Sequence, residues 1–315
     1  ITITAETGST VAVYANGVEL GNATESSTAG TFTYTSSTLV DGNYSVYATS
    51  TDTAGNVAES AAQDIIIDTV DPDLPTISSA SLSNSAAPTL TGTAEVGSTV
   101  TVVVTGSSTG ATYTTTATDG NWSIDTSSTA DLDSGTLALN ANGSNTVSVT
   151  STDAAGNASA AASQTLTLDT TDATVSASTD KADGSYTVGE EIDITLTFDE
   201  SVTLSGSAGL NITLQDGSST TVATLNVTAA ELNGVSTVTK TYTVAAGDTA
   251  GDLTVSGVAL GTSATLQDDA GNDADLSSLT ATVGTSDAIV IDTTAPATPT
   301  VASITTPDDD ATPTI

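Results

Sequence analysis

The chain contains neither cysteine nor histidine. Without these residues it cannot build a disulfide scaffold, a Ser-His or Cys-His nucleophile pair, or the usual zinc sites. The sequence also has no glycine-rich phosphate loop with its lysine. We therefore expect no enzymatic activity that depends on these groups. The absence of cysteine leaves the redox compartment open.

Basic residues are almost missing. Lys181 and Lys240 stand against 38 acidic residues, which gives a formal net charge of -36. Such a charge disfavours binding to phosphate backbones and anionic membranes, so we expect no nucleic-acid partner. No apolar run approaches membrane-spanning length, so we expect no membrane insertion. The charge favours a chain that binds cations, or one that is adapted to salt.

Aromatic residues are also scarce, at 3% of the chain. Paired carboxylates can hydrolyse a glycoside, but so few rings offer little surface on which a sugar could stack. This scarcity argues against a glycosidase. The single tryptophan, Trp122, follows the turn signal Asp119-Gly120, and we expect it to be a core residue rather than a ligand platform.

Apolar and polar residues alternate with period two through much of the chain, which predicts β-strands rather than disorder. Asn16-Gly17 lies between two such runs and is a type I′ hairpin signal. Residues 192–198 form the clearest alternating strand, which we expect to end at Asp199-Glu200. Residues 222–227 are rich in β-branched side chains and favour strand over helix. The sequence therefore predicts an all-β protein.

Two motifs recur along the chain. TAETGSTV at residues 4–11 returns as TAEVGSTV at 93–100. The loop TDTAGN at 51–56 returns as TDAAGN at 152–157 and, more loosely, as QDDAGN at 267–272. Recurrence at this spacing is typical of a tandem array of domains.

An acidic joint closes each repeat. Residues 68–72 read DTVDP, residues 169–172 read DTTD, and residues 292–296 read DTTAP, each directly after an apolar strand. Proline fixes φ in the first and third joints, whereas the second has Ala173 where a proline would be expected. Carboxylates are hard oxygen ligands of the kind that Ca²⁺ prefers. The sequence thus predicts calcium at the joints.

The Thr-Asp-x-Ala-Gly-Asn loop and the Asp-Thr-Thr-x-Pro joint resemble those of the bacterial Ig-like repeats of very large surface adhesins. The resemblance covers nearly the whole chain and is looser after residue 170. It implies tandem Ig-like β-sandwich domains in an extended rod. It also implies an extracellular, calcium-loaded extender region that holds an adhesive tip away from the cell surface. The implied domains are residues 1–70, an Ig-like domain lacking its first strand; residues 71–170, an Ig-like domain; residues 171–293, a longer Ig-like variant; and residues 294–315, a linker and the first strand of a next domain or subunit.

In an Ig-type sandwich, the loop after the second strand and the loop before the last strand lie where the chain enters the domain. Linker carboxylates should therefore meet acidic residues of both loops, where like charges would repel one another without a cation. Any single Asp in such a loop is also an ordinary turn former, so the hypothesis depends on the recurrence of the set. Asp73, Asp269, Asn157 and Asn272 are further oxygen donors. The candidate calcium ligands are Glu6, Asp52, Asp68, Asp71, Glu95, Asp153, Asp169, Asp172, Asp199, Glu200, Asp268 and Asp292.

The C-terminal residues 295–315 resemble the lead-in at 75–88, whereas residues 1–70 carry no such lead-in. Placed before another copy, this segment recreates the pattern and brings Asp292 toward the acidic loops of the first domain. Two explanations fit. Either the residues belong to a longer polypeptide of tandem repeats, or they form a subunit whose tail completes the next subunit's sheet by strand addition. Both predict neighbouring copies joined end to end.

The leading hypothesis for function is a structural one, an extracellular spacer or filament module that calcium stiffens. The alternative is an adhesin module in which residues 171–293 bind a glycan or a surface protein through longer loops. A general adaptation to salt, in place of specific calcium sites, is a variant of the first hypothesis.

Overall fold

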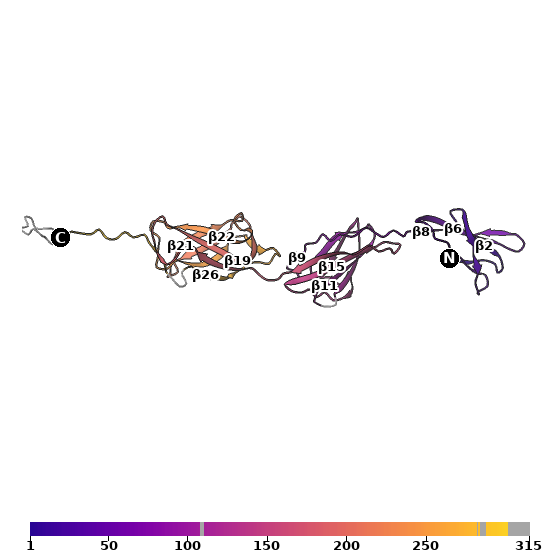
Figure 1. Ribbon diagram of the computed structural model, residues 1–315, viewed down its shortest axis with the longest axis horizontal. Coiled ribbons are helices and arrows are strands. Elements are labelled where there is room, and N and C mark those ends of the chain that lie inside the picture. The colour runs from indigo at the N-terminus through magenta and orange to yellow at the C-terminus, as the bar shows by residue number, and fades with distance from the viewer. Residues whose placement is uncertain (108–109, 282, 284–287, 302–315) are drawn as a thin grey trace, which may run out of the picture. The chain divides into compact units, whose positions relative to one another are not determined.

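The computed structural model describes residues 1–107, 110–281, 283 and 288–301. Within these ranges every regular element is a β-strand, so the predicted all-β class is confirmed. Among the same residues no helix could span a membrane. The chain divides into two units, Ile1–Asp169 and Thr170–Ile315 (Figure 1). Most of the expected C-terminal segment, residues 302–315, lies outside the described residues.

Module 1, the first group of strands in the first unit, has two sheets and a small core. One sheet has the order β1-β5-β4, and the other has the order β3-β2-β6-β7 with β8 also paired to β6. Asn16 and Gly17 both have positive φ, 49° and 77°, which confirms the type I′ hairpin. Val11, Phe32 and Ala48 form the buried cluster. The strands are β1 (Thr2–Thr4), β2 (Thr10–Ala15), β3 (Val18–Asn22), β4 (Thr24–Glu25), β5 (Thr31–Thr33), β6 (Gly42–Thr51), β7 (Val57–Glu59) and β8 (Gln63–Ile67).

Module 2, the second group of strands in the first unit, repeats this plan with a larger core. A two-stranded sheet, β10-β13, and a six-stranded sheet, β14-β12-β11-β15-β16-β9, enclose a cluster that includes Trp122, Tyr113 and Leu166. Trp122 is 2% exposed, so its predicted core position is confirmed. The strands are β9 (Leu82–Ser83), β10 (Thr89–Thr93), β11 (Thr99–Thr105), β12 (Ala111–Thr116), β13 (Asn121–Asp125), β14 (Leu132–Gly135), β15 (Gly143–Thr152) and β16 (Ala162–Leu168).

The lead-in of module 2 crosses from one sheet to the other. Thr76 N–H donates to the carbonyl oxygen of Thr93 at 2.8 Å, beside β10, and the Trp122 indole N–H donates to the Thr76 carbonyl oxygen at 3.2 Å. Further along, β9 pairs in parallel with β16. The lead-in therefore closes the gap between the outer edges of β10 and β16.

Module 3 comprises the strands of the second unit. Its sheets have the orders β22-β19-β17-β26, with β25 also on β19, then β18-β27-β23 and β21-β20-β24. One buried cluster, which includes Ile194, Ile212, Leu214 and Ile291, lies among them. The strands are β17 (Thr174–Thr179), β18 (Gly184–Tyr186), β19 (Glu191–Ser205), β20 (Leu210–Gln215), β21 (Thr221–Val227), β22 (Asn233–Thr243), β23 (Thr249–Ala250), β24 (Thr254–Leu260), β25 (Thr265–Asp268), β26 (Asp275–Ala281) and β27 (Ile289–Asp292).

Strand β19 departs from the prediction that it ends at Asp199-Glu200. It continues to Ser205. Its register with β22 shifts between Thr197 and Val202, and on its other edge β17 pairs as far as Phe198 and β25 pairs from Val202 onward. The acidic pair therefore lies at an irregularity where β19 changes partners, not at a strand end. The strand predicted at residues 222–227 is confirmed as β21.

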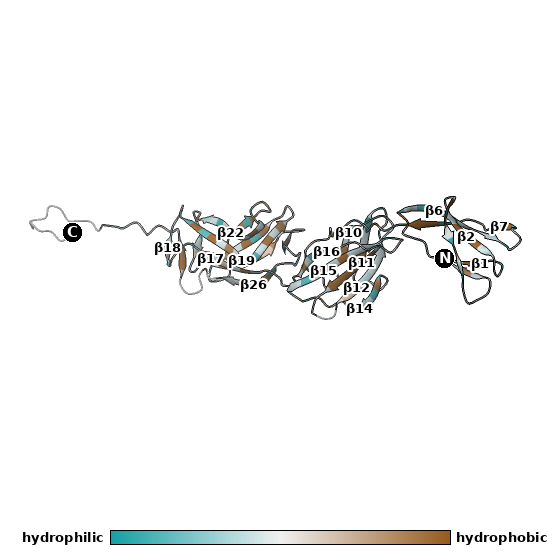
Figure 2. Cartoon of the chain, turned by 45° about the vertical axis from the view of Figure 1, so that its right-hand side comes forward, coloured by the Kyte–Doolittle hydropathy of each residue, from teal (hydrophilic) through white to brown (hydrophobic). Residues whose placement is uncertain are grey.

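Alternation explains why these segments form half-buried strands. In β19 the apolar side chains from Ile192 to Phe198 are buried at every second position, and the polar ones between them face outward. Figure 2 shows this as alternating hydropathy along the strand. Because side chains of a strand point alternately to its two faces, one face of the sheet covers the core while the other meets water.

We predict that Gly92→Ala destabilises module 2. A Cβ at position 92 would overlap the Thr76 carbonyl oxygen and lie 2.6 Å from the Trp122 ring. Overpacking of this kind costs about 1–3 kcal/mol. Urea unfolding followed by Trp122 fluorescence measures it, because the only tryptophan of the chain reports on this module. Gly143→Ala, whose Cβ would meet nothing closer than 3.4 Å, is the control and should change the midpoint little.

Candidate metal sites

An aspartate closes the same loop in all three modules. Asp153 Oδ1 accepts three backbone N–H groups of its loop at 2.7 to 2.9 Å, and Oδ2 accepts the side-chain amide of Asn157 at 2.7 Å. Asp52 and Asp268 make the corresponding bonds with the asparagine four residues further on, at 2.7 and 2.8 Å. The loop motif thus has a structural role in each module, and Oδ2 keeps an acceptor site open for another partner.

Hydrogen bonding lowers the pKa of Asp52 and of Asp153. The largest cause is the side-chain amide of Asn56 or Asn157, and backbone N–H groups add to it. A lowered pKa means that folding favours the carboxylate. The resulting stability is present above the ordinary pKa and is lost as pH falls through the lowered one. Both loops therefore hold a carboxylate at neutral pH.

In module 3, the loop aspartate is buried beside a second carboxylate. Asp268 is 5% exposed, and one of its carboxylate oxygens lies within 4.8 Å of a carboxylate oxygen of Glu200. Two carboxylates this close repel each other, the more so where water is displaced. The pair offers hard oxygen ligands of the kind that suit Ca²⁺. This donor set fits a calcium ion.

Asp199, predicted to act with Glu200, accepts two hydrogen bonds from Thr174. Its two carboxylate oxygens accept the N–H and the O–H of Thr174, both at 2.7 Å. The side-chain hydrogen bond from Thr174 is the main cause that lowers the pKa of Asp199. The bonds tie the start of β17 to β19. Sequence reasoning missed Thr174, because nothing in the local pattern signals a partner 25 residues away.

In the first unit, one linker contact reaches the loop of module 2. Asn157 Nδ2 donates to the carbonyl oxygen of Asp68 at 3.1 Å, while the Asp68 side chain accepts the N–H of Val70. Asp71 and Glu95 are exposed. Among the described residues of this unit, no three carboxylates come within 4.8 Å of one another. The contact between this linker and the Asp153 loop is therefore made by the backbone of Asp68, through Asn157, and not by the predicted carboxylates.

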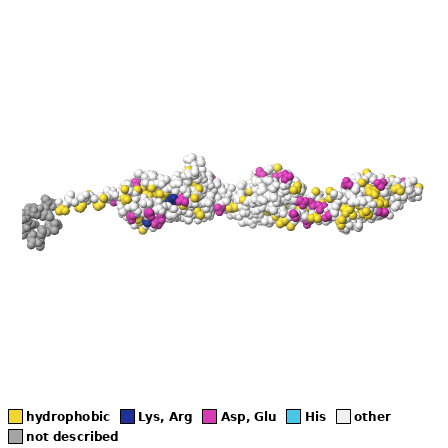
Figure 3. Space-filling model, turned by 90° about the horizontal axis from the view of Figure 1, so that it is seen from above, with side chains coloured by type: hydrophobic (Ala, Val, Ile, Leu, Met, Phe, Trp, Pro, Cys, Tyr) yellow, Lys and Arg dark blue, Asp and Glu magenta, His cyan; other side chains and the backbone are white. Residues whose placement is uncertain are grey.

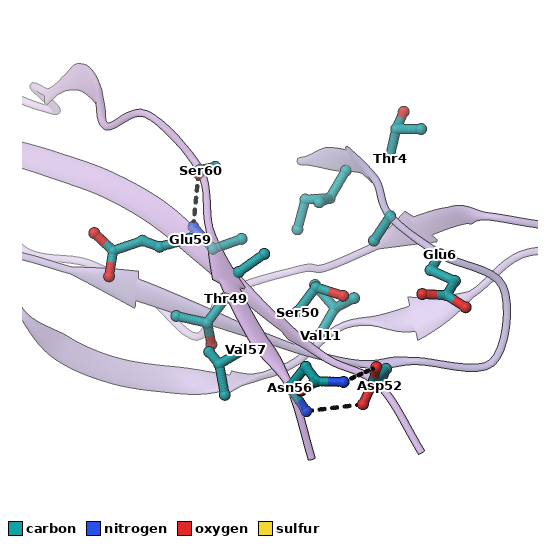
Figure 4. Close-up of a pocket in the computed structure, with 14 residues that line it drawn as sticks. Thr4, Glu6, Val11, Thr49, Ser50, Asp52, Asn56, Val57, Glu59 and Ser60 are labelled. Carbon is teal, nitrogen blue, oxygen red and sulfur yellow. Dashed lines mark hydrogen bonds between the residues drawn. The ribbon is translucent and has the colours of Figure 1, made fainter. Parts of the chain in front are cut away.

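In module 1, Glu6 and Asp52 line one pocket of about 390 Å³, together with Asn56. Figure 4 shows the two hydrogen bonds between Asn56 and Asp52, and the Glu6 side chain on another strand connection. In the described part of this module, Glu6 and Asp52 belong to no group of three carboxylates that lie within 4.8 Å of one another. The pocket has room for further ligands.

The remaining predicted ligands lie in the linker between the units or at the end of β27. Asp169 N–H donates to the carbonyl oxygen of Ser83, and Asp172 is exposed. The Asp292 side chain accepts the N–H of Thr294 at 2.9 Å. Acidic side chains are spread over both units on the face shown in Figure 3. The ligand roles of all twelve candidates stay predictions.

We predict that Asp268→Ala destabilises module 3 even without metal. The substitution removes the carboxylate oxygen that accepts the partly buried N–H of Gly271 and the buried N–H of Asn272, and this loss costs about 1–3 kcal/mol. Thermal unfolding in chelator, followed by calorimetry, measures the change. The adjacent and exposed Asp269→Ala is the control, and an equal loss in both variants would contradict the structural role.

Comparisons with solved structures return matches of low similarity. Fibronectin(III)-like modules of Clostridium thermocellum CbhA are 16% identical, with 54% of this chain and 86% of that chain covered and a TM-score of 0.34. A structure described as concerning host cell surface retention of a 1.5-MDa bacterial ice-binding adhesin is 22% identical, with coverages of 93% and 90% and a TM-score of 0.35. TM-scores this low do not establish a common overall structure.

A comparison with curated proteins finds no match. A family model described as a bacterial Ig-like domain matches residues 1–69 and again residues 76–170, which together make up more than half of the chain. The two matched stretches contain the Asp52 and Asp153 loops, and the strands of modules 1 and 2 form the paired sheets of such a sandwich. The chain belongs to the bacterial Ig-like domain family.

Proposed function

We propose that this chain is a non-catalytic, extracellular spacer of a bacterial surface adhesin or filament, with joints that calcium stiffens. Membership in the bacterial Ig-like family supports a repeat module of this kind. The lack of histidine and cysteine supports a role without catalysis. The alternative, a glycan- or protein-binding module in residues 171–293, stays a prediction.

The observation that carries the calcium proposal is the close pair formed by Glu200 and buried Asp268. Ca²⁺ takes about 6–8 oxygen ligands, so two carboxylates make up only part of a shell. In the proposal, Asp169 and Asp172 of the linker supply further oxygens. A cation there removes the repulsion between carboxylates and links the linker to the module.

The same arrangement is proposed for the other joints. At the first, Asp153 acts with Asp68, Asp71 and Glu95, and the bond from Asn157 to the Asp68 backbone supports the approach of this linker. At the third, Asp292 of one copy acts with Glu6 and Asp52 of the next. Copies joined end to end through such joints would form an extended rod at the cell surface.

We predict that calcium stabilises module 3 specifically. At a free concentration about 100 times its Kd, one site adds about 2.7 kcal/mol, which raises the melting temperature in calorimetry. Glu200→Gln removes a ligand charge and should abolish most of the increase. Glu191→Gln removes the same charge from an exposed position of the same strand and should leave it unchanged.

Two outcomes would contradict this site. Matched magnesium at equal ionic strength could give the same increase, which would favour general salt adaptation. Alternatively, Glu191→Gln could reduce the increase as much as Glu200→Gln, which would show that net charge rather than a ligand is responsible.

We also predict that calcium stiffens the joints. Small-angle X-ray scattering should give a larger maximum dimension with calcium than with chelator, because an ion that bridges linker and module restricts bending. Glu200→Gln should reduce the maximum dimension that is measured in calcium. A maximum dimension that is the same in both buffers would rule out stiffening even if calcium binds.

A further inference from the structure

Two tyrosines face each other on neighbouring strands of module 1. Tyr14 of β2 and Tyr47 of β6 are direct partners in the antiparallel register of these strands, which lie side by side in Figure 1. Their rings are stacked, with centroids 5.0 Å apart and an angle of 5° between the ring planes. Directly opposite residues of an antiparallel pair have Cβ atoms about 4.5–5.5 Å apart, so the sheet itself holds the two rings together.

The pair lies on the face of the sheet that points away from the core. Val13 and Ala15 flank Tyr14 along β2, and both are buried. Ala48, which follows Tyr47, is buried as well. Because successive side chains of a strand point to opposite faces, both tyrosine rings stand on the outer face, where they are half-buried. A reagent in solution can therefore reach them.

The hydroxyl groups of this pair differ from those of the other five tyrosines. Each of the other five donates its hydroxyl to an oxygen of the protein. Within the described residues, Tyr14 and Tyr47 make no such bond, so their O–H groups can pass a proton directly to water. The five bonded tyrosines are Tyr34, Tyr44, Tyr113, Tyr186 and Tyr242.

Few other side chains of this protein react with oxidants. Cysteine, methionine and histidine are absent from the sequence, so the usual products of sulfur oxidation cannot form. The single tryptophan, Trp122, is enclosed in the core of module 2. Oxidation is thereby directed to tyrosine. Among the described residues, Tyr14 and Tyr47 form the only stacked tyrosine pair.

We propose that Tyr14 and Tyr47 are a site of oxidative cross-linking, at which a haem peroxidase with hydrogen peroxide joins the two rings as dityrosine. Each phenol gives one electron and one proton to the oxidant, and one hydrogen peroxide is reduced to two waters. The two radicals then form a bond between the ring carbons next to their C–O carbons. Each bonded carbon loses its hydrogen as a proton, and each oxygen regains one. The sheet brings the partners together beforehand, which favours this coupling over encounters between chains.

The proposed bond belongs to module 1. Val103 and Ser148 are partners at the equivalent register position of β11 and β15 in module 2, so that module has no such pair. In module 1 the bond closes a loop of residues 14–47. A cross-link of this kind restricts the unfolded chain, as a disulfide does in proteins that contain cysteine.

Oxidation of the full chain tests the proposal. A dilute solution treated with a haem peroxidase and an equimolar amount of hydrogen peroxide should yield a monomer that is lighter by two hydrogen atoms and shows dityrosine fluorescence. Cleavage after acidic residues should then release residues 7–19 joined to residues 42–52. Tyr44→Phe is the matched control, because it leaves one tyrosine in each fragment and keeps the stacked pair. It should give the same linked fragment.

Tyr14→Phe and Tyr47→Phe should each abolish the linked fragment. Both variants keep the ring and remove a hydroxyl that bonds no described residue, so the fold should be preserved. The yield per chain should stay constant on dilution and fall in urea, because the folded sheet aligns the rings. Covalent dimers in place of the lighter monomer, an unchanged yield in either variant, or an equal yield in urea would overturn the site.

Hydrogen exchange measures what the bond does to module 1. Amides of β2 and β6 should exchange more slowly in the linked chain, because the two strands stay tethered when the sheet opens. Tyr14→Phe after the same treatment is the control and should keep its original exchange rates. Equal exchange before and after linking would overturn the stabilising effect.

Discussion

The structure depends on one recurrent interaction, the carboxylate that closes the Asp-x-x-Gly-Asn loop. One oxygen of Asp52, Asp153 or Asp268 satisfies backbone donors that would otherwise be unpaired, and the other meets the asparagine amide. The loop joins two strands of the same sheet, so its geometry also sets where the linker can approach. A fixed charge is thereby held at the same place in each module, and any cation site at the joints has to be built around it.

The same residue can serve folding and binding because its two oxygens have different surroundings. Oδ1 is saturated by the loop, whereas Oδ2 keeps an acceptor site. Asp199 is held differently, since its two oxygens accept the N–H and the O–H of one residue, Thr174. Acidic residues that look alike in the sequence therefore differ in their hydrogen-bond partners.

Much of the local structure could be predicted from the sequence. The hairpin at Asn16-Gly17, the core position of Trp122 and the repeated loop depend on signals within a few residues. The course of β19 beyond Asp199-Glu200 could not, because it depends on pairing with β25, which follows much later in the chain. The candidate site was predictable only as a set of carboxylates. Which of them approach one another depends on such non-local pairing.

Gly92 is paired with Trp122 in module 2, whereas Ile3 is paired with Phe32 at the equivalent position of module 1. This difference has a consequence for folding. Neighbouring repeats of similar sequence are prone to trade strands as they fold. A traded β1 would set Ile3 against Trp122, where not even a Cβ has room, and a traded β10 would leave a void beside Phe32. The difference in side-chain size at this paired position therefore disfavours the exchange of β1 and β10 between the two modules.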